Sequence, residues 1–538
     1  MPLPRSSRIL TPPALLLLGI LAACDSTPPP PVIPNTTPEL EAAELSGALR
    51  LPVRLAGMPD EPLPLRERLR HHAVPGVAIA VVDGGELRWA EGYGVLTAGS
   101  EDPVTPDTRF QVGSLSKPLA ATLALRAVAA DRLDLDVEID AVLRAAGAAY
   151  ELPRGGFAGA VTPRRLLSHT AGVGQPSVSG YSAGEPLPNL EQSLGGSAPA
   201  NHPAIAVERA PGSGWAYSGG GYEVLRRVLV ALDGPFDAAM RREIFEPLEM
   251  LASGFGAEPP AGGPVARGHG VTSSEDSEAR RAIQIDDGWR RHPEYAAAGL
   301  WSTAPDLTAW LVDLQKSHAG KPGRRLPRDL TRTMLEPQTD ANGWGLGLEL
   351  RGRGHSRYFV HRGATAGYRA LVVGFIHSGH GAVVLTNGDG GDALAREIIA
   401  ALAEQYAWPA LQPQVRSTVD VDDATLDALV GSYRGLELPS LTLTVERTDD
   451  GLTARTWSGA TRLYAASSTS FFDLEQGLSL DIDTADRDDP DGDDLDGNSQ
   501  APVRLTLRSL HGMTLTFGLE TDTDSDPIAD SATHRGTS

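Results

Sequence analysis

Residues 111–117 read Gln-Val-Gly-Ser-Leu-Ser-Lys, which places Lys117 three positions after Ser114. The apolar residues that follow predict a helix that begins at Ser114 and runs to about residue 131. Residues three apart share one face of a helix, so the lysine amine can reach the serine hydroxyl. A serine hydroxyl is a poor nucleophile until a base takes its proton, and a lysine whose pKa is lowered by burial can be that base. The stretch therefore predicts a nucleophilic serine at a helix start, where free N–H groups can stabilise an oxyanion.

The composition makes this serine–lysine pair more specific than the pattern alone. The chain contains three lysines, Lys117, Lys316 and Lys321, so 44 of its 47 Lys and Arg residues are arginines. Neither of the other two lysines has a serine three positions before it. Arginine cannot lose its proton in a protein, whereas lysine can. A chain that uses arginine almost everywhere and keeps Lys117 beside Ser114 favours a catalytic lysine over one on a helix surface.

Two later stretches contain further candidate residues. Residues 211–222 place Tyr217 before a glycine cluster and a helix start, and a phenol beside an ammonium group can carry protons. In residues 359–368 a predicted strand carries His361, and Gly363 two positions on would let a ligand approach the backbone. Taken alone, the tyrosine and the histidine are better explained as structural residues.

In this order the three stretches resemble the serine β-lactamase and penicillin-binding superfamily, in particular its class C β-lactamase and D-Ala-D-Ala carboxypeptidase group (peptidase family S12). That family has Ser-x-x-Lys, then Tyr-x-Asn, then Lys-Thr-Gly or His-x-Gly. Here 103 positions lead from Ser114 to Tyr217 and 144 from Tyr217 to His361, which suits the family. Residues 165–172, 245–250 and 298–303 also look like the family, and the likeness runs from about residue 63 to 405.

The resemblance implies a role for each of these residues. Ser114 would be the acylated nucleophile and Lys117 its activator. Tyr217 would pass protons to the leaving group and from the deacylating water, and His361 would lie across the cleft. The oxyanion-hole and substrate-binding residues implied are Ser114, Gly219, Gly363 and Ala364, with the N–H groups of Ser114 and Ala364 as the oxyanion donors.

Two departures from the family pattern concern the substrate. Gly219 stands where the family has Asn, whose side chain would hold the substrate amide. His361 replaces the lysine of Lys-Thr-Gly, so a fixed positive charge for a substrate carboxylate is lost; this form is typical of carboxypeptidase, D-aminopeptidase and esterase-like relatives. Arg362 would restore the charge only if it pointed into the cleft, and neighbours on a strand alternate faces.

The distribution of elements predicts an α+β fold. Strands are expected at 76–82, 86–90, 344–350, 358–361, 370–376 and 382–386, with helices between the second and third of them and a last helix at 392–405. One sheet would then be built from both ends of the domain, with a helical subdomain inserted. The resemblance implies a β-lactamase/transpeptidase-like domain, an antiparallel sheet flanked by helices, over residues 56–408.

Past residue 409 the pattern changes to short alternating runs, at 441–445, 452–457, 462–464, 470–472, 503–507 and 513–517. These runs predict a small all-β, barrel-like domain over 415–520, followed by a flexible tail at 521–538. An acidic run at 481–498 alternates Asp as an EF-hand loop does but lacks its Gly and distal Glu, so a solvated loop is favoured. The pair His71-His72 lies so close to a predicted strand start that a linker is favoured over a metal site.

The N-terminal residues predict export and lipid attachment. Arg5 and Arg8 precede an apolar run at 14–20 that is too short to span a bilayer, and residues 21–24 read Leu-Ala-Ala-Cys. This end resembles the bacterial lipobox. Residues 1–23 are therefore predicted to be a lipoprotein signal peptide, and Cys24 the acylated residue that anchors the chain to a membrane of the cell envelope, on its extracytoplasmic or periplasmic face. Residues 24–55 are expected to be a Pro-rich spacer.

Composition excludes several classes of protein. The formal net charge of −22 argues against a nucleic-acid partner and against docking on anionic lipid by charge alone. Cys24 is the only cysteine, so neither an intrachain disulfide nor a cysteine-based zinc site can form. We expect no cofactor and no metal, and as partners a small-molecule or peptide substrate and the membrane.

Together these features predict a membrane-anchored serine hydrolase that acts through an acyl-enzyme. Cell-wall-type D-amino-acid peptides or related amides are the favoured substrates, ahead of small esters and β-lactams. A non-catalytic penicillin-binding receptor that is acylated, or merely binds, stays open because Gly219 replaces the family's Asn. An α/β-hydrolase esterase is disfavoured because its order of elements differs.

Overall fold

The computed structural model describes residues 37–519 except for 60, 176, 275–276, 340–342, 437–440, 450, 457–458, 484–503 and 510–513. The predicted signal peptide with Cys24, all but the first three residues of the predicted acidic loop, and the predicted tail lie outside the described residues. Within the described part of the chain, no helix is long and apolar enough to cross a bilayer.

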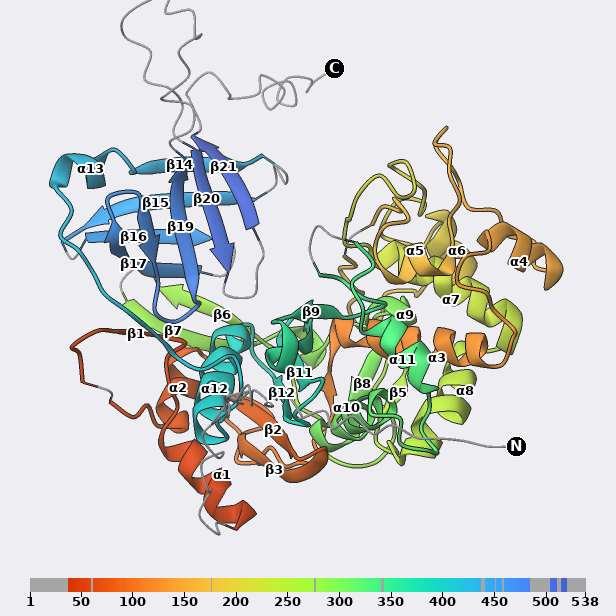
Figure 1. The fold of residues 1–538 in the computed structure, drawn as a ribbon, viewed down its shortest axis with the longest axis horizontal. Coiled ribbons are helices and arrows are strands. Elements are labelled where there is room, and N and C mark those ends of the chain that lie inside the picture. Colours follow the sequence, from red (N-terminus) through yellow and green to blue (C-terminus); the bar gives the residue numbers. More distant parts are fainter. Residues whose placement is uncertain are drawn as a thin grey trace, which may run out of the picture. The chain divides into compact units, whose positions relative to one another are not determined.

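A six-stranded antiparallel sheet forms the centre of the large domain (Figure 1). In order across the sheet, its strands are β3 (Glu86–Gly94), β2 (Gly76–Asp83), β12 (Gly381–Thr386), β11 (Tyr368–Phe375), β10 (Tyr358–Thr365) and β9 (Glu349–Arg351). The prediction of one sheet built from both ends of the domain is confirmed. The strand predicted at 344–350 is shorter than expected, because Trp344 pairs with Glu349 only in an isolated bridge.

Both faces of this sheet are covered, because its central strands are mostly apolar and are buried at nearly every position. Along β2, successive residues alternate between two cores: Ala78 and Ala80 belong to one, Val77 and Ile79 to the other. The first core also contains α3 (Ser116–Ala129) and α10 (Ala304–His318), and the second contains α1 (Pro38–Gly47), α2 (Leu65–His71) and α12 (Gly391–Gln405). The strand order places β10 between β11 and the edge strand β9.

The predicted helical subdomain lies between β3 and β9. Its helices are α4 (Ile139–Ala145), α5 (Pro163–Leu167), α6 (Leu190–Gly195), α7 (Gly219–Asp233), α8 (Phe236–Met240), α9 (Tyr295–Ala298) and α11 (Arg328–Met334). Its strands are β4 (Phe110–Gln111), β8 (Leu300–Ser302) and β5 (Gly254–Phe255), which pair in that order, and the hairpin β6 (His269–Ser274) and β7 (Ser277–Gln284). α6 falls in a Gly/Ser/Pro-rich segment, where reciprocal capping by Asn189 and Gln192 starts a helix.

The Pro-rich spacer was expected to reach residue 55, but its last part is folded. The Thr37 hydroxyl caps α1 and Pro38 occupies its first turn, where proline favours a helix start. On the buried face of α1, Glu41 accepts hydrogen bonds from Arg88 (2.7 Å) and from the Tyr406 hydroxyl (2.6 Å). Proline content alone therefore misplaces this boundary, because one proline starts a helix that packs on the large domain.

The C-terminal domain is a closed antiparallel barrel (Figure 1). Its strands are β14 (Gly431–Gly435), β15 (Thr442–Thr448), β16 (Gly451–Thr456), β17 (Gly459–Ser467), β18 (Ser470–Phe472), β19 (Leu478–Asp483), β20 (Arg504–Ser509) and β21 (Thr514–Leu519). The all-β class is confirmed, but the sequence pattern does not predict β14 or β19, since β14 is rich in glycine and β19 runs into the acidic segment. The predicted start at 415 is early. It falls in β13 (Gln414–Arg416), which pairs in parallel with β1 (Val53–Leu55), and α13 (Asp423–Asp427) also precedes the barrel.

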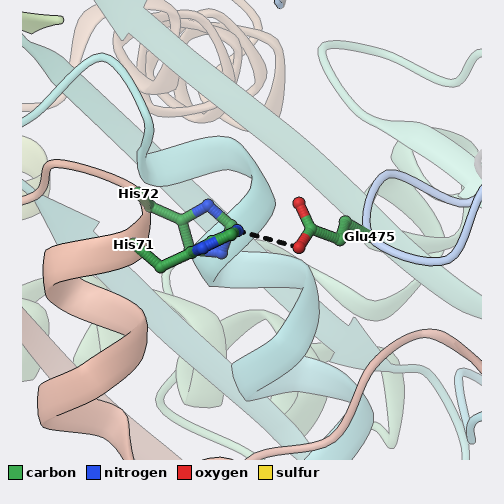
Figure 2. A group of neighbouring side chains, drawn as sticks. All are labelled: His71, His72 and Glu475. Atoms are coloured by element: carbon green, nitrogen blue, oxygen red, sulfur yellow. Dashed lines mark hydrogen bonds and ion pairs between the residues drawn. The ribbon is translucent and has the colours of Figure 1, made fainter. Parts of the chain in front are cut away.

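An ion-pair network joins α2 to the barrel loop between β18 and β19 (Figure 2). The His71 Nε2 atom lies 2.8 Å from the Glu475 carboxylate, and the Arg68 guanidinium lies 3.0 Å from it. Arg68 and His72 both contact Glu397 of α12, at 2.5 and 2.8 Å. The linker predicted for the histidine pair is wrong, since His71 ends a helix and His72 is fully buried.

His71, His72 and Glu475 have ligand atoms within 4.8 Å of one another, a spacing that a metal ion could use. The Arg68 guanidinium, however, lies 3.0 Å from Glu475 and 3.2 Å from the His72 Nε2 atom. A bound cation would have to displace this fixed positive charge. The residues present therefore fit an ion-pair network better than a metal centre.

We predict that Glu475→Gln lowers the melting temperature at pH 7 by roughly 2–6 °C, because a charge-assisted contact is lost. Burial alone would raise the pKa of Glu475, but the hydrogen bonds from His71 and Arg68 lower it to about 2. The stability that this carboxylate contributes is present above its ordinary pKa of 4.5 and is lost as the pH falls towards 2. Melting curves of both proteins should therefore converge over that pH range.

The control is Glu446→Gln, whose ion pair with Arg455 is solvent-exposed and should contribute little. A melting-temperature difference between Glu475→Gln and the wild type that widens as the pH falls would contradict this account.

Candidate active site

Ser114 lies in a tight turn that leads directly into α3. Residues Gly113–Leu115 form this 3-10 turn, η1, and Gly113 has a φ of +50°, which glycine adopts without strain. The Ser116 hydroxyl donates to the Gly113 carbonyl (2.7 Å) and accepts from the Leu300 N–H (3.0 Å). η1 is thereby fixed to β8, and Ser114 is held ahead of the helix.

Lys117 reaches back from the first turn of α3 to Ser114. Its Nζ atom donates to the Ser114 Oγ (3.2 Å) and to the Ala297 carbonyl (2.9 Å). Ala297 is fixed in turn, because its N–H donates to the buried carboxylate of Glu223 (3.2 Å). The Lys117 side chain is only 2% exposed. The three-residue spacing thus brings the amine to the hydroxyl, where it can accept the hydroxyl proton.

Tyr217 comes to the same place from a segment 100 residues further along the chain. The Lys117 Nζ atom lies 4.8 Å from the centre of the Tyr217 ring and 5.7 Å from that of Tyr222. Ser218, the next residue, caps α7, and its hydroxyl accepts from the Gly221 N–H at 2.7 Å. The start of α7 therefore fixes the backbone that carries the Tyr217 phenol.

His361 lies on β10 and is 3% exposed. Its Nδ1 atom is 2.8 Å from the Arg362 carbonyl, and because a carbonyl only accepts, Nδ1 carries the proton. Burial and the nearby charge of Lys117 lower the pKa of His361 to about 3, so the ring is neutral at physiological pH. Nε2 then offers a lone pair, and it has no partner among the described residues. His361 is a hydrogen-bond acceptor here and not a fixed positive charge.

The structure shows the surroundings of the two positions that depart from the family pattern, His361 with its neighbour Arg362, and Gly219. Arg362 pairs with Glu349 of β9 at 3.5 Å, a carboxylate that Arg351 also contacts, so its guanidinium is engaged by β9. Gly219 is the first residue of α7 and offers only its backbone. The position therefore provides no amide side chain for a substrate.

Gly363 and Ala364 lie against η1. A Cβ atom on Gly363 would lie 1.8 Å from the Val112 carbonyl oxygen, and one on Gly113 would lie 2.7 Å from the Ala364 carbonyl oxygen. The two backbones therefore touch, which places Ala364 beside the turn that holds Ser114, the other predicted oxyanion donor. Gly363 was expected to admit a ligand to the strand; in the structure it admits the backbone of η1 instead.

The sequence patterns do not predict an aromatic cluster beside Tyr217. The Trp344 ring centre lies 5.1 Å from that of His169, 5.5 Å from that of Trp215 and 5.7 Å from that of His361. One ring nitrogen of each of these four residues is buried without a partner in the described part of the chain. The sequence feature that could have pointed to this cluster is the resemblance of residues 165–172, which include His169, to the family.

A second serine motif does not take part in this arrangement. Residues 180–184 read Gly-Tyr-Ser-Ala-Gly, the spacing of a nucleophile elbow, which requires a strand, a sharp turn and a helix. Here Tyr181 makes only an isolated bridge, no helix follows directly, and Ser182 is bound by Arg290 and Arg291. The elbow geometry is therefore not formed.

The arrangement of Ser114, Lys117 and Tyr217 under a sheet that is covered on both faces defines a serine hydrolase of the Ser-x-x-Lys type. The chain belongs to the beta-lactamase family, whose profile matches residues 65–407.

Curated relatives carry several different names. Penicillin-binding protein 4 of Amycolatopsis lactamdurans is 29% identical over 64% of this chain and 91% of its own. Esterase EstB of Burkholderia gladioli is 31% identical over 36% of this chain and half of its own. D-aminopeptidase of Brucella abortus (strain S19) is 24% identical over 65% of each chain.

Solved structures show the same fold. The crystal structure of SurE has a TM-score of 0.53 and 25% identity, and covers 85% of this chain and 97% of its own. We define the hydrolase domain as residues 37–411. The SurE structure covers 85% of this chain, which is more than that domain contains, so the similarity extends beyond it.

We predict that Gly363→Ala slows phosphonylation of Ser114 by a fluorophosphonate roughly 10- to 100-fold, because the new methyl group collides with backbone and pushes β10 from η1. The rate would be measured by intact mass over time. Gly47→Ala is the control, since a Cβ there meets nothing within 4 Å. Equal labelling rates for both variants would contradict the proposed contact.

Proposed function

We propose that this protein hydrolyses amides of D-amino acids, such as cell-wall-type peptides, through an acyl-enzyme on Ser114. The observation that carries the proposal is the 3.2 Å contact between Lys117 Nζ and Ser114 Oγ, with the Tyr217 ring 4.8 Å from the same amine. The names of two relatives, penicillin-binding protein and D-aminopeptidase, support the substrate class.

Acylation begins at the contact between Ser114 and Lys117. Once Lys117 has lost its own proton, its amine takes the hydroxyl proton as Ser114 Oγ attacks the substrate carbonyl carbon. The N–H groups of Ser114 and Ala364 stabilise the oxyanion. As the C–N bond breaks, Tyr217 gives its proton to the leaving amine, and the Lys117 ammonium returns a proton to the phenolate. The products of this step are an ester on Ser114 and a free amine.

Deacylation reverses these proton transfers with water as the nucleophile. Water attacks the ester carbonyl while its proton passes to the Tyr217–Lys117 pair, which acts as the base. The ester C–O bond then breaks, Ser114 Oγ recovers a proton, and the acid product leaves. Ser114, Lys117 and Tyr217 each end in their starting protonation state, so these residues alone carry out every proton transfer of the cycle.

The polar groups around the nucleophile favour amides over substrates with a free carboxylate at the leaving group. The neutral His361 presents an acceptor, which suits a substrate N–H or ammonium group. The Arg362 guanidinium is already engaged by Glu349 of β9. An aminopeptidase or amidase therefore fits these residues better than a carboxypeptidase does.

An esterase is the second candidate. Gly219 offers no side chain to hold a substrate amide, and the esterase of Burkholderia gladioli is 31% identical over the part it matches. A small ester needs no such contact, so the observation favours this alternative over a β-lactamase.

We also propose that the enzyme is a lipoprotein of the bacterial cell envelope. The proposal is supported by the Leu-Ala-Ala-Cys sequence at 21–24 after a short apolar run. Acylation of Cys24 would hold the hydrolase at the extracytoplasmic face, where cell-wall peptides are found.

The first test is turnover of D-alanine p-nitroanilide by the purified chain, with the L-isomer as the stereochemical control. We expect release of p-nitroaniline from the D-isomer, and phosphonylation or penicilloylation at Ser114 by peptide mapping. Lys117→Arg keeps the charge but cannot accept the proton, so it should lose about 10²- to 10⁴-fold in kcat/KM. Stable penicilloylation of Ser114 without any amide or ester turnover would favour the non-catalytic receptor.

For the anchor, we expect the wild-type chain to incorporate an alkyne-labelled fatty acid in a bacterial host and to fractionate with membranes. Cys24→Ala should abolish both, because the thiol is the acylation site. Label that persists on Cys24→Ala would contradict the lipoprotein proposal.

A further inference from the structure

His169 holds the segment of Tyr217 from three sides. The Ser218 N–H donates to the His169 Nδ1 atom (3.1 Å), and the Ala216 N–H donates to the His169 carbonyl (2.8 Å). The His169 ring also lies against the Tyr217 ring, with centres 4.4 Å apart and planes inclined by 35°. One residue thus fixes the backbone on each side of Tyr217 and one face of its phenol.

The backbone at His169 is not one that histidine prefers. It follows α5 in a left-handed conformation, with a φ of +59°, and the side chain is 2% exposed. Glycine or asparagine usually occupies such a position after a helix. A residue held in a sparsely populated conformation points to a local function.

The hydrogen bond requires the neutral ring. Nδ1 accepts from a backbone N–H, so it carries no proton, and Nε2 carries it instead. Burial, with the charge of Lys117, lowers the pKa of His169 well below its ordinary value, so this tautomer persists at physiological pH. Protonation would break the bond to Ser218 and place a second cation near Lys117.

We propose that His169 is a positioning residue that holds the Tyr217 phenol beside the Lys117 amine for proton transfer to the leaving group. The inference rests on the role of Tyr217 in the proposed function. It predicts that His169 is needed where the leaving group must receive a proton, and much less where it leaves as an anion.

The experiment compares kcat/KM for D-alanine p-nitroanilide, whose amine must be protonated, with that for a p-nitrophenyl ester, whose phenolate leaves unaided. His169→Phe keeps the ring and removes the acceptor; we expect a roughly 10- to 100-fold loss on the anilide and a change of under about threefold on the ester and in fluorophosphonate labelling. His169→Asn keeps an acceptor and suits the left-handed backbone, so it should retain more anilide activity than His169→Phe.

The double variant Tyr217→Phe/His169→Phe should lose no more anilide activity than Tyr217→Phe alone, because His169 acts through that phenol. The control is His269→Asn: His269 is buried and its Nε2 accepts the Ala98 N–H at 3.0 Å, the same kind of bond at another place. This control should lower the melting temperature and leave the ester-to-anilide ratio unchanged.

Parallel losses on ester and anilide, or additive losses in the double variant, would reduce His169 to a structural residue and overturn the proposal. If His169→Phe does not fold, kcat/KM of His169→Asn is compared on the same ester and anilide. Equal losses on the two substrates would then overturn the proposal. A wild-type chain that Ser114 probes do not label, or a Tyr217→Phe variant with full anilide activity, would instead refute the proposed function.

Discussion

The close contact between the backbones of η1 and β10 sets the geometry around Ser114. It exists because neither Gly113 nor Gly363 has a Cβ atom, so a turn and a strand meet where side chains would hold them apart. Bound to β8 on its other side through Ser116, the turn cannot shift without moving the sheet. Ser114 belongs to a short 3-10 turn, but that turn is held by two separate sheets, through β10 on one side and β8 on the other.

Around this contact a single buried amine is surrounded by neutral rings. His169 and His361 are uncharged because burial disfavours their protonation and the charge of Lys117 disfavours it further. In a medium of low polarity, proton transfer among Ser114, Lys117 and Tyr217 meets few competing acids or bases. The histidines therefore shape the site while leaving its proton chemistry to three residues.

The sequence predicts those parts of the site that depend on local spacing. Ser114 and Lys117 are one helical turn apart, so their contact follows from the periodicity alone, whereas Tyr217 and His361 were assigned only through a resemblance. Ala297 and Trp344 gave no signal, since their positions depend on contacts across more than 100 residues. The sheet followed from apolar runs, but α1 did not, because a proline-rich composition hides a capped helix start. The pattern also does not predict two barrel strands, because β14 is rich in glycine and β19 runs into the acidic segment.

β1 has a consequence for how the two domains stay together. This short strand of the hydrolase domain pairs with β13, which follows that domain and leads to the barrel, and its Val53 N–H donates to the Leu474 carbonyl in the barrel (3.3 Å). The polypeptide between α12 and β13 is therefore one of several connections between the domains. A protease that cut it would sever the covalent link and leave the strand pairing and the hydrogen bond in place, so the nicked protein would migrate as two fragments only under denaturing conditions.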